Sequence, residues 1–470
     1  MKACLERADF EKRGRLAGFP DDDPLMFREP SVVIDSRKIH GGEIFFALKG
    51  ERTDGHHFVG QAFGKGAACA VVSGEWFDQE RTEERIDNAR YLVVDDTVAA
   101  LQSLAGAYRM TFDIPLVGIG GSNGKTTTKE MTASVLGGCC NVHMSEGNLN
   151  NHLGVPLTLF GLRRDHEVAV VEMGINHPGE MELLCDIAGP THGLLTNIGH
   201  EHLEYLVDLD GVTQAETALY RYLEQNSGII FLNGGDRRLV EAADGCDSRV
   251  MYGIKHEDSS VWAEDIRIDG SGKALFRLSS HEESVMVSLS FAGRHNVSNA
   301  VAAAAVGLHF GLRPQDVARG LESLCPKSGW KRLEFQNAGG IIVVNDTYNA
   351  NPDSMRHALD LLCELPAKGK RVAVLGDMLE LGEGSVSEHR NIGRYAAGLE
   401  PLDILFTFGE EAASVCMAAG TKCSGSFMEE GALQEALDAL LHPGDVLLLK
   451  ASRGMRLERF AEALMKHATD

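Results

Sequence analysis

A chain of 470 residues exceeds what one hydrophobic core usually supports and is expected to form about three domains. Its hydrophobic content of 44% is typical of a folded protein, and its formal charge of −23 argues against nucleic acid or an anionic membrane surface as a partner. Any phosphate-bearing ligand must therefore be held by local groups. No apolar run reaches the roughly 18–20 residues that a membrane span needs.

Residues 1–112 contain the short apolar runs SVVID, EIFFAL, CAVVS and RYLVVDD, with one helix expected around residues 61–66. This pattern predicts a small α/β domain. Residues 113–324 alternate apolar strands, such as EVAVVEMG and HGLLTNIGH, with helical patches, and they end in the alanine-rich helix NVSNAVAAAAVGLHFG. That order is typical of a mainly parallel sheet.

Residues 325–470 repeat a strand that ends in a polar turn before a helix, in GIIVVND, KRVAVLGDM, DILFTFG and DVLLLKASRG. This repetition predicts a doubly wound, Rossmann-like sheet. In such folds ligands meet the carboxyl ends of the strands, so the polar turns are where we expect the chemistry.

The stretch GIGGSNGKTTTKEM follows an apolar strand and opens a helix, which directs backbone N–H groups and the positive end of a helix dipole at an anion. Five residues separate Gly118 from Gly124, one more than in the strict nucleotide signature, so the motif is a variant. A glycine turn with a surface lysine is the alternative. We favour a nucleotide site, with Lys125 near the terminal phosphates and the Thr126 hydroxyl at Mg²⁺. The predicted phosphate-loop residues are Gly121, Ser122, Asn123, Gly124, Lys125, Thr126 and Thr127.

Two strand ends in the second segment carry polar side chains that suit a metal ion. Glu172 ends EVAVV, where its carboxylate is placed to hold Mg²⁺, unless it is an ordinary solvated turn residue. His200 ends GLLTNIG and is predicted to contact metal or phosphate, with a structural histidine as the alternative.

Three further features are candidates for contact with a nucleotide. Asn296 and Asn299 lie one helical turn apart, where they would either read a purine edge or cap the helix. Arg332 is a candidate charge clamp, although taken alone it is also a typical surface arginine. Asp346 ends a strand in the third segment.

The ten cysteines show no Cys-x-x-Cys spacing, and the adjacent Cys139 and Cys140 are expected to fill the core. The first residues, MKACLERADFEKRGR, are charged throughout and are not typical of a secretory signal. We therefore predict a cytoplasmic protein with reduced thiols. We also expect a monomer, although no feature of the sequence determines the oligomeric state.

The motifs GSNGKTTTKE, EGNLNNHLGVPLTL, TNIGHEHLE, GRHNVSNAVAAAA, NDTYNANPDSM and LGDMLELG occur in the order in which the Mur ligases carry them. The chain resembles this family of ATP-dependent, amide-forming enzymes over nearly its whole length. DTYNANPDSM with LGDMLELG is most similar to the member that joins D-alanyl-D-alanine to UDP-N-acetylmuramoyl tripeptide, whose third peptide residue is lysine or diaminopimelate.

The resemblance implies an N-terminal domain for the UDP end of the substrate (1–112), a central ATPase domain (113–324) and a C-terminal Rossmann-like domain (325–470). It also implies that the γ-phosphoryl group of ATP passes to a peptide carboxylate, which an amine then attacks. The roles that it implies are Lys125 and Arg332 at the phosphates, Thr126, Glu172 and His200 at Mg²⁺, Asn296 and Asn299 at the base, Asp346 at ATP, and Asp35, Ser36 and Arg37 at the uridine diphosphate.

One departure from the family concerns the second Mg²⁺. Members usually carry a lysine that becomes a carbamate at this metal, whereas here VTQAETALY places Glu216 at the lysine position. Glu216 would then be either a shorter carboxylate ligand or a solvated helix residue.

Rival functions remain open from the residues alone. A nucleotide-gated binding protein would use the same loop as a switch, without transferring phosphate. Within the ligases, the rivals are a Mur ligase that adds a single amino acid or diamino acid, and an enzyme similar to folylpolyglutamate synthase.

Overall fold

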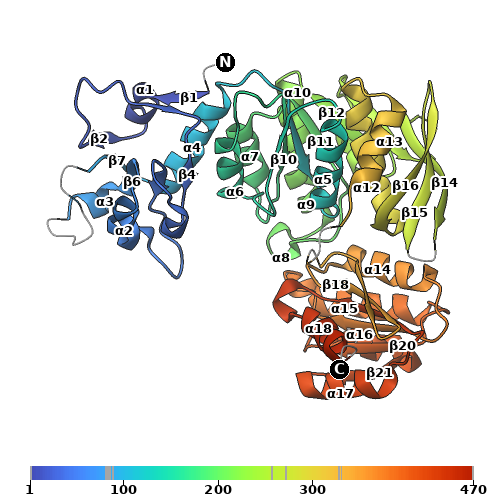
Figure 1. Ribbon diagram of the computed structural model, residues 1–470. Helices are drawn as coiled ribbons and strands as arrows, with labels where there is room; N and C mark the ends of the chain where they lie inside the picture. Colours follow the sequence, from blue (N-terminus) through green and yellow to red (C-terminus); the bar gives the residue numbers. More distant parts are fainter. Residues whose placement is uncertain are drawn as a thin grey trace.

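The computed structural model describes residues 3–79, 86, 89–255, 258–269, 272–326, 329 and 331–467. Within these residues three large sheets follow one another along the chain, each with helices packed against it (Figure 1). The predicted α/β class is therefore confirmed. The domain boundaries near residues 112 and 324 stay a prediction.

The first sheet has five strands in the order β2-β7-β6-β5-β4, parallel except where β2 meets β7. Its inner strands are short and, apart from Ser73 at the end of β6, apolar, and all their other side chains are buried. A separate two-stranded ribbon pairs β1 with β3, which flank β2 in the chain. The elements are β1 (Cys4–Glu6), α1 (Arg7–Glu11), β2 (Arg15–Ala17), β3 (Met26–Arg28), β4 (Val32–Val33), β5 (Ile44–Phe46), α2 (Val59–Gly64), β6 (Cys69–Ser73), α3 (Gly74–Phe77), β7 (Tyr91–Val94) and α4 (Thr97–Arg109).

The central sheet has nine strands in the order β16-β15-β14-β13-β12-β11-β8-β10-β9. It is parallel from β9 to β14, as predicted, and continues into an antiparallel meander, β14-β15-β16. Its strands are β8 (Leu116–Gly120), β9 (Val142–Met144), β10 (Val168–Glu172), β11 (His192–Leu195), β12 (Ile229–Asn233), β13 (Arg249–Ile254), β14 (Val261–Ile268), β15 (Lys273–Ser280) and β16 (Ser284–Ala292).

Strand β8 lies between β10 and β11, so the carboxyl ends of these three strands meet at one edge. Helix α12 packs on α5, and the two approach so closely at Gly307 that a Cβ there would clash with Val135 of α5. The helices of this segment are α5 (Lys125–Leu136), α6 (Gly154–Phe160), α7 (Glu180–Ala188), α8 (Leu203–Leu206), α9 (Leu209–Glu216), α10 (Ala218–Gln225), α11 (Arg237–Ala242), α12 (Arg294–His309) and α13 (Pro314–Ser323).

The third sheet has six strands in the order β17-β18-β22-β19-β20-β21, and only β17 runs antiparallel. In Figure 1 this part of the chain, in orange and red, lies beneath the central sheet, whereas the blue N-terminal part lies to one side of it. The elements are β17 (Glu334–Ala338), β18 (Ile341–Asp346), α14 (Pro352–Glu364), β19 (Arg371–Gly376), α15 (Ser385–Ala397), β20 (Ile404–Phe408), α16 (Ala413–Ala419), β21 (Cys423–Phe427), α17 (Glu430–Leu440), β22 (Val446–Lys450) and α18 (Glu458–His467).

The cysteines depart from the sequence prediction in two ways. Cys416 and Cys423 form a disulfide that joins α16 to β21, while the other eight cysteines, all within the described residues, are free. Cys139 is exposed and Cys140 half-buried, so the expectation that this pair fills the core is wrong; both follow the end of α5 at the surface. Within the described chain, no helix is long and apolar enough to cross a bilayer.

Candidate active site

The glycine loop connects the end of β8 to the start of α5, as predicted. Gly121 and Gly124 have φ of +103° and +88°, a left-handed conformation that favours glycine. A Cβ at Gly124 would also clash with the Asn299 carboxamide on α12, so this position has no room for a side chain. The loop is thus shaped by its own glycines and by the helix beside it.

The N–H groups of the loop are only partly available for phosphate. Those of Ser122 and Asn123 donate to the backbone O and side-chain Oδ1 of Asn197, at 2.8 and 3.1 Å. The Gly121 N–H donates to Glu216 Oε2 at 2.9 Å. The first turn of α5, which begins at Lys125, is therefore the part of the loop oriented to receive an anion.

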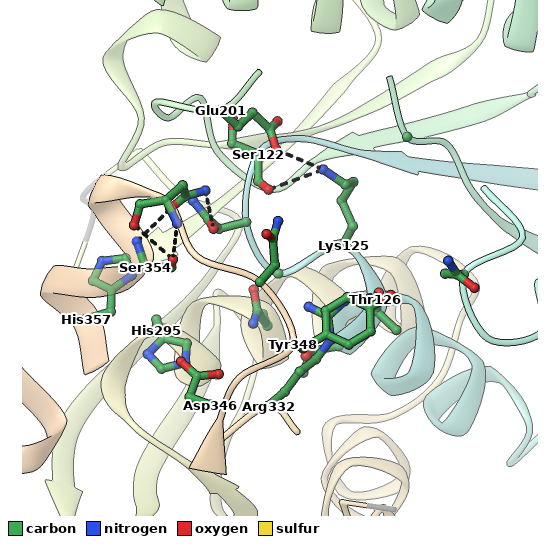
Figure 2. Close-up of a pocket in the computed structure, with 18 of the residues that line it drawn as sticks. Ser122, Lys125, Thr126, Glu201, His295, Arg332, Asp346, Tyr348, Ser354 and His357 are labelled. Atoms are coloured by element: carbon green, nitrogen blue, oxygen red, sulfur yellow. Dashed lines mark hydrogen bonds and ion pairs between the residues drawn. The ribbon is translucent and has the colours of Figure 1, made fainter. Parts of the chain in front are cut away.

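A cavity of about 400 Å³ opens over this turn, and both the central and the C-terminal segments contribute to its wall (Figure 2). Of the predicted site residues, those that line it are Ser122, Asn123, Gly124, Lys125, Thr126, Thr127, Glu172, Asn296, Asn299, Arg332 and Asp346. Those that do not are Gly121, His200, Glu216, Asp35, Ser36 and Arg37.

Lys125 is folded back onto its own loop. Its ammonium donates to the Gly121 carbonyl and, at 3.2 Å, to that of Ser122, and it lies 3.5 Å from Glu201 Oε2. Burial opposes its charge, but the carboxylates of Glu201, Glu216 and Glu172 outweigh burial and raise the pKa of Lys125. The cation is thus held charged at the cavity wall.

Glu172 meets the Thr126 hydroxyl where β10 ends. Its Oε1 accepts from Thr126 Oγ1 at 3.2 Å and from Asn150 Nδ2 at 2.9 Å, while its buried Oε2 has no hydrogen-bond partner among the described residues. A hydroxyl, a carboxylate and an orphaned carboxylate oxygen suit Mg²⁺. The described residues hold no group of three or more His, Cys, Asp or Glu side chains arranged for a metal, so phosphate and water would have to complete its shell.

Lys129 was not identified from the sequence. Its side chain is 0% exposed, and its ammonium donates to the carbonyls of Ser145 and Gly147 at 2.8 and 3.2 Å and lies 3.8 Å from Glu172 Oε2. It therefore ties the strand-end carboxylate to the segment after β9. One lysine within a helix gives no sequence signal of such burial.

The structure brings His202, not His200, to the cavity. His200 points to the third segment, where its Nδ1 lies 3.2 Å from Asp353 Oδ2, and this hydrogen bond raises the pKa of His200. His202 has φ of +51°, a left-handed conformation, directly before α8. Its Nδ1 lies 2.7 Å from Glu380. The geometry therefore does not support the metal role predicted for His200.

Glu216 lies behind the loop. Its side chain is completely buried, so the alternative of a solvated helix residue is wrong. Burial raises the pKa of Glu216 from its usual 4.5 to about 7, against the nearby charge of Lys125. Since Glu216 accepts from the Gly121 N–H and does not line the cavity, its predicted role as a metal ligand lacks support from this geometry.

The third segment reaches the loop through Arg332. Its Nη2 donates to Thr126 Oγ1 at 3.3 Å, and its guanidinium lies 3.9 Å from the centre of the Tyr348 ring. Asp346 is paired with the buried Lys450 at 2.6 Å. Neither Tyr348 nor Lys450 was singled out from the sequence, although both line the cavity.

Asn296 and Asn299 are both buried at the start of α12. Asn299 Nδ2 donates to Asn296 Oδ1 at 2.9 Å, and Asn296 Nδ2 donates to the Ala292 carbonyl at 2.7 Å. Both amide donors therefore have partners inside the protein. Contact with a purine stays a prediction.

The predicted uridine site lies in the first segment, within the turn Ser36–Lys38. Asp35 accepts from the Arg37 N–H at 2.9 Å, and the Arg37 guanidinium bound to the same carboxylate lowers the pKa of Asp35 to about 2. Ser36 is buried and donates to Gln61 Oε1 at 2.6 Å. Arg37 keeps 84% of its side chain exposed, so it is the member best placed to meet a ligand.

A glycine loop at the switch point of a parallel sheet, faced by cations from a second α/β unit, defines a nucleotide-binding enzyme of the phosphoryl-transfer type. The chain belongs to the Mur ligase family. Residues 119–307 match the Mur ligase middle domain, residues 331–453 the Mur ligase glutamate ligase domain, and residues 31–109 the family's catalytic domain.

Relatives and solved structures agree with this assignment. The chain is 36% identical, over 93% of both chains, to UDP-N-acetylmuramoyl-tripeptide–D-alanyl-D-alanine ligase of Bacillus subtilis (strain 168), and 34% identical to that of Escherichia coli (strain K12), over 93% of this chain and 94% of that one. It resembles crystal structure I of MurF from Acinetobacter baumannii with a TM-score of 0.86 and 33% identity, over 99% of this chain and 100% of that one. The structure of MurF ligase from Thermotoga maritima in complex with ADP has a TM-score of 0.82 and 28% identity, over 94% of this chain and 98% of that one.

Proposed function

We propose that this chain is an ATP-dependent ligase that joins D-alanyl-D-alanine to UDP-N-acetylmuramoyl tripeptide, with release of ADP and phosphate, in peptidoglycan precursor synthesis. The observation that carries the proposal is the likeness to enzymes of that name over 93% of the chain, at 34–36% identity in the two relatives above. More distant ligases share the fold alone. Folylpolyglutamate synthase of Mycobacterium tuberculosis, for example, is 16% identical.

The chemistry proceeds in two balanced steps. The terminal carboxylate of the tripeptide attacks the γ-phosphorus of ATP, so ADP leaves and an acyl phosphate forms. The amine of D-alanyl-D-alanine then attacks the acyl carbon, loses a proton, and expels inorganic phosphate as the amide forms. Lys125 and Arg332 reduce the repulsion between the two anions, since both cations line one cavity.

Thr126 and Glu172 are the residues that would hold Mg²⁺, which supplies charge neutralisation at the phosphates when bound. We assign the uridine diphosphate end to the turn of Asp35, Ser36 and Arg37, with Arg37 as the exposed cation. The cavity is formed by residues of one chain, so the site needs no second copy, and we propose that the protein acts as a monomer. We place the reaction in the cytoplasm, and the eight free thiols favour that compartment while the Cys416–Cys423 disulfide does not.

The test is phosphate release from ATP with UDP-N-acetylmuramoyl tripeptide, with and without D-alanyl-D-alanine. We expect release to require both substrates and to match the disappearance of the amine. Release with a single amino acid or diamino acid in place of the dipeptide would favour another Mur ligase activity. Release without loss of any amine would favour a nucleotide-gated binding protein.

A further inference from the structure

Cys139 and Cys140 form a pair of neighbouring thiols for which the reaction above gives no role. Their Sγ atoms lie 3.2 Å apart. Both residues follow the end of α5, where their N–H groups donate to the Leu136 carbonyl at 3.0 and 2.9 Å. Because Cys139 is exposed and Cys140 half-buried, a molecule from solvent can reach the pair.

An internal disulfide is an unfavourable product of this pair. The Cα atoms of adjacent residues are about 3.8 Å apart, whereas disulfides usually join Cα atoms about 4.4–6.8 Å apart. Burial and the hydrogen bond with Cys139 also raise the pKa of the Cys140 thiol well above its usual range, so this thiol keeps its proton and reacts slowly with disulfides. The two residues therefore persist together as a reduced dithiol.

The distance between the two sulfurs selects the geometry of a ligand that bridges them. With bonds to sulfur of about 2.3 Å, as in zinc thiolates, a linear centre needs sulfurs about 4.6 Å apart and a tetrahedral one about 3.8 Å. A pyramidal centre, with bonds near a right angle, needs about 3.3 Å, close to the 3.2 Å observed. Trivalent arsenic is such a centre, because its lone pair takes the fourth position. In the described parts of the chain, no further His, Cys, Asp or Glu side chain completes a three-ligand metal group with the pair.

We propose that Cys139 and Cys140 bind a monosubstituted trivalent arsenical, R–As=O, through both sulfurs. In this condensation the As=O bond and two S–H bonds break, two As–S bonds form, and the oxygen leaves as water with both thiol protons. Arsenic stays trivalent, so the step needs no oxidant or reductant, and it consumes neutral thiols. The 12 residues of α5 span about 18 Å, so the pair lies far from the phosphate-facing turn at Lys125 and is a site separate from catalysis.

The experiment titrates the full chain, without reductant, with phenylarsine oxide and measures the adduct by intact mass spectrometry, and a protease digest locates it. The test variants are Cys139→Ser and Cys140→Ser. Cys325→Ser is the matched control, because Cys325 is exposed and its Sγ contacts a serine hydroxyl, not a thiol. Cys416→Ser removes the disulfide, whose cysteines would offer a second dithiol if they were reduced. Thermal unfolding verifies that each variant is folded.

We expect the wild type, Cys325→Ser and Cys416→Ser to take up one arsenical, which an added dithiol removes and an excess of monothiol does not. Cys139→Ser and Cys140→Ser should each weaken binding about 10²-fold or more, because the second bond to sulfur is no longer intramolecular. The digest should place the adduct on the fragment that holds both cysteines, and this result decides the question even if a variant does not fold.

The proposal is overturned if the wild type keeps no arsenical in excess monothiol, if the adduct lies on another fragment, or if Cys139→Ser binds normally. It is also overturned if Cys416→Ser abolishes binding, which would assign the arsenical to the reduced disulfide pair. Because neither ATP nor peptide is present, a failure of the D-alanyl-D-alanine assignment would leave these results unchanged.

Discussion

Lys125 has structural as well as chemical partners in this fold. Its ammonium is the positive centre among the carboxylates of Glu201, Glu216 and Glu172, and it also closes the loop through two backbone carbonyls. A residue chosen by its motif as a phosphate ligand therefore also balances the buried charge around it. Its replacement should affect folding as well as catalysis.

Lys125→Ala is expected to lower turnover by about 10²–10³-fold or more, because a preorganised charge at the transferring phosphoryl group is lost. It should also lower the free energy of unfolding by up to about 3–5 kcal/mol, since Glu201 is left buried without its partner. Phosphate release and urea unfolding measure the two effects. The double variant Lys125→Ala, Glu201→Gln should regain stability but not turnover; if it regains neither, the ion pair is not the cause.

Glu216 predicts a pH dependence of stability. Burial raises its pKa from 4.5 to about 7, so between these values the folded state retains a proton that the unfolded state has lost. This contribution is fully present below pH 4.5 and is lost as the pH rises to about 7, at most about 3 kcal/mol. Urea unfolding of the wild type and of Glu216→Gln should therefore show the wild type losing stability relative to the variant across this window. A difference that is constant with pH would contradict the assignment.

At the scale of elements, the strands that were predicted are short apolar runs that end in a polar turn, whereas β14, β17 and β21 mix polar with apolar residues and were not identified from the sequence. The loop before α5 was predictable because glycine and lysine spacing reports local backbone geometry. The site was less predictable where it depends on how the chain is arranged in space. His202, which has a left-handed backbone conformation, lines the cavity while His200 does not, and no periodicity in the sequence distinguishes the two. The burial of Glu216 and Lys129 likewise depends on packing between distant segments.

The contact of the loop with α12 can be tested at Gly124. Gly124→Ala introduces a Cβ that collides with the Asn299 carboxamide, at a residue whose φ is +88°. We expect the free energy of unfolding to fall by about 1–3 kcal/mol and nucleotide affinity to fall with it. Adding Asn299→Ala should relieve the collision and recover part of the stability, while the backbone strain stays. Calorimetric melts of the single and double variants measure this, and purely additive effects would exclude the collision.

For the whole molecule, the central and third segments meet through polar contacts around the cavity and through apolar ones beside it, where Leu203 and Ala292 pack in the hydrophobic core of the third segment. Arg332 reaches Thr126, and Asn351 Nδ2 donates to Asn123 Oδ1 at 3.0 Å. Asp353, in the first turn of α14, accepts from the His200 N–H at 2.9 Å and also contacts its ring. Because the cavity wall is divided between the two segments, we expect the third segment to move relative to the loop and to close during catalysis.

Asp353→Asn should shift this arrangement towards an open form, because it removes the charge that attracts the His200 imidazole. Small-angle scattering should give a larger radius of gyration for the variant without ligand, and a non-hydrolysable ATP analogue with UDP-tripeptide should restore the wild-type value. In the wild type the ion pair should weaken as the pH rises through the raised pKa of His200, and the radius should increase with it. Asp360→Asn is the matched control, since Asp360 lies on the same helix but bonds to Tyr395 within the third segment. Identical scattering of all three proteins, with and without ligands, would show that closure does not depend on this contact.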